Sequence, residues 1–149
     1  MVIHIQPYKT EYKEELLSVW EKSVVATHHF LKMEDFLEIK QFLNEFDFEI
    51  ITVFCLLDHT KVAGFIGLQN TKIEMLFLDP TYSGQGWGTQ LTAFAIEQFG
   101  VNRVDVNEQN TAAKHFYEKQ GFEVVERTEK DDMGKDYPLL RMQLKNKTK

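Results

Sequence analysis

The sequence has a single cysteine, Cys55, among its 149 residues, so no intramolecular disulfide can form. This excludes a disulfide-rich secreted scaffold and favours a reducing compartment. Proline is also scarce, with three residues, and no segment rich in serine, glycine and proline divides the chain. A chain of this length is typical of one domain. We therefore expect a single domain over residues 1–144 and a frayed tail over residues 145–149.

Long apolar runs and an excess of positive charge are lacking as well. The longest apolar stretch, residues 50–57, is far shorter than the roughly 20 residues that cross a membrane. The first residues have no basic segment followed by an apolar one, so we predict no signal peptide and a cytoplasmic location. The formal net charge of -6 argues against a surface that grips nucleic acid phosphates. Neither a membrane nor a nucleic acid is an expected partner, and the oligomeric state stays open.

The spacing of apolar residues predicts a chain of short strands and helices. Strands are expected at residues 2–6, 50–57, 62–69, 72–78, 103–106, 122–127 and 137–144. Helices are expected at residues 10–25, 36–43, 88–99 and 110–120, with Asn110 as the N-cap of the last one. The order β-α-α-β-β-β-α-β-α-β-β gives hairpins first and β-α-β units later. It predicts an α/β fold in which helices cover both faces of a mixed sheet.

A glycine-rich turn, Ser-Gly-Gln-Gly-Trp-Gly-Thr at residues 83–89, lies between a predicted strand and a predicted helix. The first N–H groups of a helix have no partner within it, and glycines let a phosphate approach the backbone. The turn is no P-loop because it lacks lysine, and no Rossmann fingerprint because Thr89 replaces the third glycine. A flexible turn without a ligand is the plain alternative. Otherwise the pattern G-x-G-x-G indicates a pyrophosphate site of another type.

Four motifs together resemble the GNAT superfamily of acetyl-CoA-dependent N-acetyltransferases. In the family's order and spacing they are Leu-Phe-Leu-Asp-Pro at 76–80, Gly-Gln-Gly-Trp-Gly at 84–88, Asn-Glu-Gln-Asn-Thr-Ala-Ala at 107–113 and Phe-Tyr-Glu-Lys-Gln-Gly-Phe at 116–122. Shorter stretches, such as residues 26–31 and 131–140, resemble the YjaB-like bacterial branch. Ser83 departs from the Arg or Gln that usually opens the family's pyrophosphate motif. Since backbone N–H groups are the family's main phosphate donors, we expect cofactor binding to persist with somewhat lower affinity.

The resemblance implies that an amine attacks the thioester of acetyl-CoA directly. It also implies that the strand at residues 72–78 splays from its parallel neighbour, so that backbone groups contact the cofactor. The implied cofactor-binding residues are Leu76, Phe77, Leu78, Gly84, Gln85, Gly86, Trp87, Gly88, Thr89, Asn110 and Tyr117. Tyr117 matches the tyrosine that faces the thioester sulfur in many members, which makes it the expected acid for the leaving thiolate. The alternative is a tyrosine that only packs beside Phe116.

The base that takes a proton from the amine is left open by the sequence. A base is worth seeking because keeping a lysine-like amine neutral at pH 7 costs about 4–5 kcal/mol. Glu74, on the strand that enters the cofactor site, and His28, in the branch-like segment, are the catalytic candidates. Asp105 or a chain of water molecules is a further possibility. Each residue has a structural alternative, a salt bridge for the carboxylates and packing for the histidine.

The expected function is an acetyl-CoA-dependent N-acetyltransferase that acts on an unidentified amine. A non-catalytic domain that binds or senses acyl-CoA is the alternative, and the acidic charge disfavours acetylation of charged tRNA. The same charge weakly favours a cationic amine. We expect no metal, because the sequence has no H-E-x-x-H or C-x-x-C motif and the adjacent His28 and His29 cannot form an i, i+4 pair. Residues 129–136 are expected to form a solvated turn, and the segment 137–140 to line the acceptor pocket.

Overall fold

The structure is a computed structural model that describes residues 3–145. Its main elements are β1 (Ile3–Pro7), α1 (Lys13–Thr27), α2 (Met33–Glu45), β2 (Thr52–Asp58), β3 (Lys61–Gln69), β4 (Lys72–Leu78), α3 (Trp87–Phe99), β5 (Arg103–Asn107), α4 (Thr111–Lys119), β6 (Phe122–Thr128) and β7 (Leu139–Leu144). Three short 3-10 turns are η1 (Thr10–Tyr12), η2 (Phe48–Ile50) and η3 (Pro80–Tyr82). This order confirms the predicted α/β fold. Val2, placed in the first predicted strand, and residues 146–149 of the expected tail lie outside the described residues.

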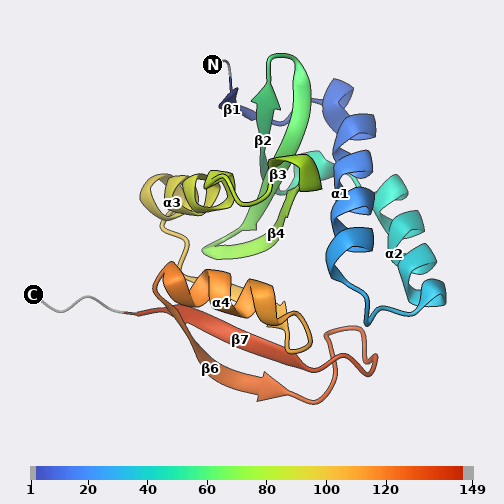
Figure 1. Cartoon of the computed structure of the whole chain (residues 1–149), viewed down its shortest axis with the longest axis vertical. Helices are drawn as coiled ribbons and strands as arrows, with labels where there is room; N and C mark the ends of the chain where they lie inside the picture. Colours follow the sequence, from blue (N-terminus) through green and yellow to red (C-terminus); the bar gives the residue numbers. More distant parts are fainter. Residues whose placement is uncertain (1–2, 146–149) are drawn as a thin grey trace, which may run out of the picture.

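The seven strands form one sheet in the order β1-β2-β3-β4-β5-β7-β6. Neighbouring strands are antiparallel except β4 and β5, which are parallel, so the sheet is mixed as predicted. One apolar core packs under α3 and α4, and a second packs under α1 and α2 on the opposite face. Figure 1 shows α1 and α2 beside the half of the sheet that contains β1 to β4, and α4 over the half that contains β6 and β7.

Side chains along β2 and β4 alternate between the two cores, as the pleat of a β-strand predicts. On β2, Leu56 packs on the side of α3 and α4, whereas Cys55 packs on the side of α1 and α2. On β4, Leu76 and Leu78 face α3 and α4, whereas Phe77 faces α1 and α2. Burial raises the pKa of the Cys55 thiol to about 12, so it is a packed apolar side chain at neutral pH. The end of β4, residues 76–78, therefore contributes side chains to both faces of the sheet.

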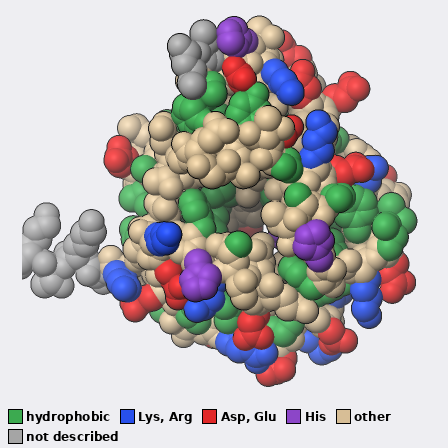
Figure 2. Space-filling model, viewed as in Figure 1, with side chains coloured by type: hydrophobic (Ala, Val, Ile, Leu, Met, Phe, Trp, Pro, Cys, Tyr) green, Lys and Arg blue, Asp and Glu red, His purple; other side chains and the backbone are tan. Residues whose placement is uncertain are grey.

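The strands β4 and β5 part soon after they begin. Their parallel ladder has two residue pairs, Lys72 with Arg103 and Ile73 with Val104. On its other edge β4 pairs with β3 up to Leu78, and β5 pairs with β7 along its whole length. The splay that the family resemblance implied is therefore present. Figure 2 shows that the surface is hollowed near the centre of the view, between α3 and α4.

Several predicted boundaries differ from those of the structure, including the helix predicted at residues 36–43, which spans residues 33–45, and local hydrogen bonds explain two of the differences. Ile50 was predicted to begin a buried strand but lies in η2 and is 68% exposed, because the Asp47 side chain accepts from the N–H of Glu49 at 3.0 Å and caps this turn. The helix predicted from residue 10 begins at residue 13, after η1. The strand predicted from residue 137 begins at residue 139, because the N–H of Tyr137 donates to Lys135 within the preceding turn.

Lys145, the last residue that the structure describes, is hydrogen-bonded to the rest of the fold. The N–H of Lys145, which we expected to open a frayed tail, donates to the carbonyl of Gly121 at 2.9 Å. Within residues 3–145 no helix combines the length and the apolar character needed to cross a membrane.

Candidate active site

The glycine turn leaves backbone donors without partners at the start of α3. Gly84 and Gly86 have φ values of 74° and 90°, in the left-handed region that favours glycine, and a Cβ at either would meet no atom within 4 Å. The N–H of Gln90 donates to Gly86 at 3.1 Å, and no side chain caps the helix. The N–H groups of residues 87–89 therefore have no partner within α3. Open space beside the positive end of a helix dipole fits a pyrophosphate.

The polar side chains of this turn fold back onto the protein. Ser83 and Gln85 donate to backbone carbonyls of η3 at 3.0 and 3.2 Å. The hydroxyl of Thr89 accepts from Gln120 at 3.1 Å, and Trp87 packs against the core under α3 and α4. The turn therefore offers backbone rather than side-chain groups to a ligand.

The helices α3 and α4 approach each other closely beside the gap that opens between β4 and β5. A Cβ at Gly88 would lie 3.3 Å from the ring of Phe116, so a side chain at this position would push the two helices apart. Asn110 begins α4, and its side-chain oxygen accepts from the N–H of Ala113 at 3.1 Å. This confirms the predicted N-cap. The start of α3 lies beside β4, because a Cβ at Gly88 would be 3.8 Å from the side chain of Leu78.

The open edge of β4 carries main-chain groups that face the gap. The N–H of Asp79 donates to the carbonyl of Ala63 on β3 at 2.8 Å. Because the N–H and C=O groups of successive residues point to opposite edges of a strand, those of Leu76 and Leu78 point away from β3. Those of Phe77 point toward β3, where Phe77 is paired with Phe65. Of the three predicted residues on β4, two therefore present their backbone to the gap.

Tyr117 lies in α4 and is 6% exposed. Its ring makes edge contacts with Phe116 and Phe122, at centroid distances of 4.9 and 5.6 Å. Burial raises the pKa of the phenol above its ordinary value of 10.0. The hydroxyl is therefore protonated at neutral pH, as a proton donor must be.

On the opposite face, a cavity of about 230 Å³ lies where α1 and α2 meet β4, β5 and the connection between β6 and β7. Its walls include Trp20, His28, Asp35, Phe77, Asn107 and Tyr137. His28 ends α1, and its Nδ1 lies 2.7 Å from the hydroxyl of Thr27. Burial, with a smaller contribution from the neighbouring His29, lowers the pKa of the His28 imidazole. At pH 7 this histidine is neutral and can accept a proton.

The connection between β6 and β7 is fixed to α2 by a cluster that we call the Asp35 latch. The Asp35 carboxylate accepts from the hydroxyl of Tyr137 and pairs with the ammonium group of Lys135 at 3.0 Å. Lys135 also pairs with Glu38 at 2.8 Å, and the Tyr137 hydroxyl accepts from the N–H of Lys32 at 3.1 Å. The hydrogen bonds from Tyr137 and Lys135 lower the pKa of Asp35. The solvated turn predicted for residues 129–136 is therefore anchored at one end, and Tyr137 lines the cavity.

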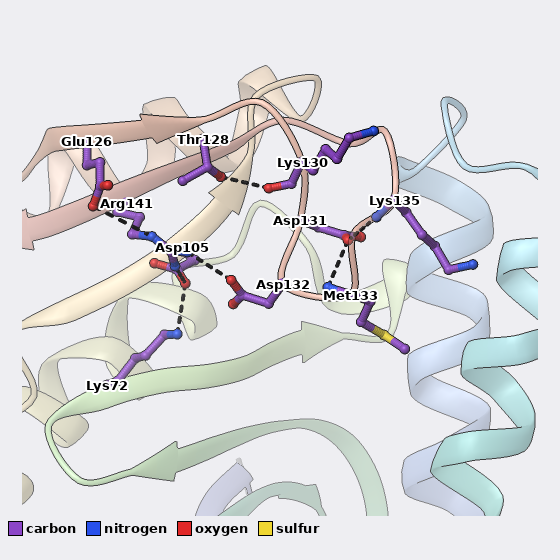
Figure 3. Close-up of polar contacts among 10 residues, drawn as sticks. All are labelled: Lys72, Asp105, Glu126, Thr128, Lys130, Asp131, Asp132, Met133, Lys135 and Arg141. Carbon is purple, nitrogen blue, oxygen red and sulfur yellow. Dashed lines mark hydrogen bonds and ion pairs between the residues drawn. The ribbon is translucent and has the colours of Figure 1, made fainter.

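The structure places the three candidate bases in different surroundings. His28 lines the cavity, whereas Glu74 is exposed in an adjoining groove on the same face. Asp105 pairs with Lys72 at 2.8 Å and with Arg141 at 2.6 Å. Figure 3 shows these side chains together on β4, β5 and β7, where Arg141 also reaches acidic groups of β6 and of the β6–β7 connection. Asp105 is thus held by two cations. Within the described residues no group of three or more His, Cys, Asp or Glu side chains is placed to hold a metal ion.

Comparisons with known proteins agree with this geometry. A family described as "Acetyltransferase (GNAT) domain" has a sequence model that matches residues 9–145. The peptidyl-lysine N-acetyltransferase YjaB of Salmonella typhimurium is 38% identical over 142 residues, which cover 95% of this chain and 98% of that protein. The solution structure of apo YjaB from Escherichia coli superposes with a TM-score of 0.88 at 37% identity, covering 96% and 97% of the two chains. A PaiA N-acetyltransferase from Thermoplasma acidophilum in complex with coenzyme A has a TM-score of 0.74 at 24% identity, covering 98% and 100%.

Proposed function

The chain belongs to the GNAT family of acetyltransferases, and we propose that it transfers the acetyl group of acetyl-CoA to the side-chain amine of a peptidyl lysine. The observation that carries lysine as the acceptor is the 38% identity, over 95% of the chain, with enzymes named peptidyl-lysine N-acetyltransferases. The cavity of about 230 Å³ supports it, because it adjoins the end of β4 and contains His28, a neutral imidazole that can accept a proton from an amine.

Backbone groups on the side of α3 and α4 would hold acetyl-CoA, which supplies the activated acetyl group. The N–H groups of the glycine turn and of residues 87–89 would bind the pyrophosphate. The gap-facing backbone of Leu76 and Leu78 would hold the pantetheine arm and the acetyl oxygen, and Asn110 would contact the arm. Since all these groups except the Asn110 side chain belong to the main chain, an acidic protein can bind this anionic ligand without lysine or arginine at the site.

Side chains would move the protons. His28 takes a proton from the lysine amine as the nitrogen–carbon bond forms. The Tyr117 hydroxyl gives a proton to the sulfur as the carbon–sulfur bond breaks. The lysine ammonium first loses one proton to solvent, because only the neutral amine can attack. The nitrogen then loses a second proton to His28 and the sulfur gains one from Tyr117, and both residues return to their starting states by proton exchange with solvent. Glu74, in the adjoining groove, is the alternative base.

The proposed function is tested by incubating the protein with acetyl-CoA and lysine-containing peptides, and following thiol release and peptide mass. We expect acetylation of the lysine side chain, with peptides bearing only a free N-terminal amine as the comparison. A non-catalytic acyl-CoA sensor would bind acetyl-CoA but release no thiol with any amine. That result would replace the proposed function by the alternative.

We expect His28→Gln to lower kcat/KM about a hundredfold near neutral pH. In the unaltered protein, activity falls as the pH drops through the pKa of His28, because the protonated ring accepts no proton. Burial lowers this pKa, so the fall lies below pH 6.5. The variant loses this part of the pH profile, whereas His29→Gln keeps it. Titration of the substrate amine affects the unaltered protein and the two variants alike. If Glu74→Gln abolishes the acid limb and His28→Gln retains it, Glu74 is the base.

A further inference from the structure

A larger cavity, of about 550 Å³, adjoins the candidate acceptor cavity on the face of α1 and α2. It lies between α2 and β4, and we call it the apolar groove. Its walls include Phe42, Phe46, Ile51, Met75 and Met133. Trp20, Ile39, Phe77 and Met133 line both cavities, so the groove continues directly from the place proposed for the acceptor lysine. Its volume lies within the roughly 300–1,000 Å³ of typical ligand sites.

Two large apolar side chains of the groove are exposed without a structural reason. Phe42 is 58% exposed, and among residues 3–145 its ring contacts one other ring, that of Phe46, at a centroid distance of 5.6 Å. Met133 is 68% exposed, and Figure 3 shows it reaching from the β6–β7 connection toward α1. The Asp35 latch holds this connection in place. Exposed apolar side chains that gather around a cavity are typical of a binding surface.

The charged groups of the groove are both acidic. Glu38 and Glu74 are its ionisable lining residues. Glu38 is paired with Lys135 at 2.8 Å, whereas Glu74 has no ion-pair partner within residues 3–145. A ligand that is apolar in the groove and positively charged beside it therefore complements this surface.

We propose that the apolar groove binds the peptide segment next to the acceptor lysine and selects a large apolar side chain followed or preceded by a basic residue. The apolar side chain packs against Phe42 and Met133, and the basic residue pairs with Glu74. The two cavities share lining residues and an extended chain advances about 3.3–3.6 Å per residue, so the apolar residue lies close to the lysine in the peptide sequence. This inference rests on the proposed function, because the lysine in the first cavity sets the position of the peptide.

The test uses short peptides, blocked at both ends, with one central lysine in a serine background. One set places a leucine at each position near the lysine, and a second set adds an arginine beside the leucine. Two quantities are measured, the KM for acetyl transfer and the Kd of the labelled peptide for the protein saturated with CoA. We expect leucine at one position to lower both about tenfold with kcat unchanged, and arginine to lower them further.

Phe42→Ser identifies the groove, and Met33→Ser is the matched control. Met33 is 69% exposed on the same helix, and neither cavity includes it among its walls. Phe42→Ser removes the advantage of the leucine peptide and leaves the all-serine peptide unaffected, whereas Met33→Ser changes neither. Equal effects on both peptides, or no preference for leucine in the unaltered protein, overturn the inference.

The two readouts separate this inference from the proposed function. Binding of leucine peptides that depends on Phe42, without any acetylation, supports the groove and contradicts the transfer reaction. Acetylation without a preference for leucine supports the reaction and contradicts the groove. If Phe42→Ser instead converts a dimer to a monomer in sedimentation, the groove is an interface between copies of the chain and the inference fails.

Discussion

Gly86→Asp is expected to weaken acetyl-CoA binding at least about a hundredfold while the chain stays folded. The aspartate places a negative charge at the start of α3, where the proposal puts the pyrophosphate and where the helix dipole otherwise attracts it. Gly86 has a φ of 90°, so a side chain there also costs about 1–2 kcal/mol of backbone strain. A Cβ at this position meets no neighbour, so the cost to stability is confined to this strain. Titration calorimetry with acetyl-CoA measures the affinity, and thermal unfolding without ligand measures stability.

Gly100 provides the matched control for this substitution. It ends the same helix with a φ of 66°, and a Cβ there also meets no atom within 4 Å. Gly100→Asp therefore introduces the same charge with backbone strain comparable to that of Gly86→Asp. Only the change at Gly86 affects acetyl-CoA affinity, because only it lies at the end of α3 that attracts anions. Wild-type affinity in Gly86→Asp would show that the pyrophosphate does not bind at this turn.

Tyr117→Phe is expected to lower kcat about 10²–10⁴-fold with little change in the affinity for acetyl-CoA. The phenylalanine keeps the ring and its edge contacts with Phe116 and Phe122, so the core stays filled. The substitution removes the hydroxyl, which supplies the proton to the leaving sulfur in the proposed mechanism. Burial raises the pKa of this hydroxyl. We therefore expect the activity of the unaltered protein to fall at high pH only above pH 10.0, where the hydroxyl loses its proton.

Tyr8→Phe is the control for loss of a tyrosine hydroxyl elsewhere in the core. Tyr8 packs against Phe48 at a centroid distance of 5.8 Å, near the start of α1. We expect its removal to leave kcat unchanged. Both variants are compared with a peptide that the unaltered protein acetylates, by initial rates at saturating acetyl-CoA. An unchanged kcat in Tyr117→Phe would exclude Tyr117 as the acid.

The parts of the site that sequence could predict depend on neighbouring residues. The glycines at 84 and 86 and the cap at Asn110 act within one turn of chain, so their residue types already indicate their conformations. The order of strands and helices could be predicted for the same reason, because each element has a local pattern of apolar residues. The splay of β4 from β5 has no such local signal, because it depends on how two strands distant in sequence diverge, and here it came from the family resemblance. Ile50 was misplaced since Asp47 caps a turn that apolar spacing alone does not indicate.

The Asp35 latch and the apolar groove were beyond sequence reasoning. Asp35 and Tyr137 are 102 residues apart, and neither has a local motif that indicates the other. Phe42 looks like one more apolar residue of an amphipathic helix, and its exposure is visible only once α2 is packed against the sheet. Contacts of this kind arise from tertiary packing, which a single sequence does not encode in any short pattern.

The Asp35 latch also has a mechanical consequence for the gap between β4 and β5. The two halves of the sheet are joined at the narrow end of the gap by the pairs Lys72 with Arg103 and Ile73 with Val104. Beyond its wide end, the latch links the connection before β7 to α2, and α1 packs on β3 and β4. The gap is therefore braced at both ends, and we expect its width to change little when a ligand binds. A ligand entering it orders little of the chain, so little of its binding free energy is spent on closing the protein around it.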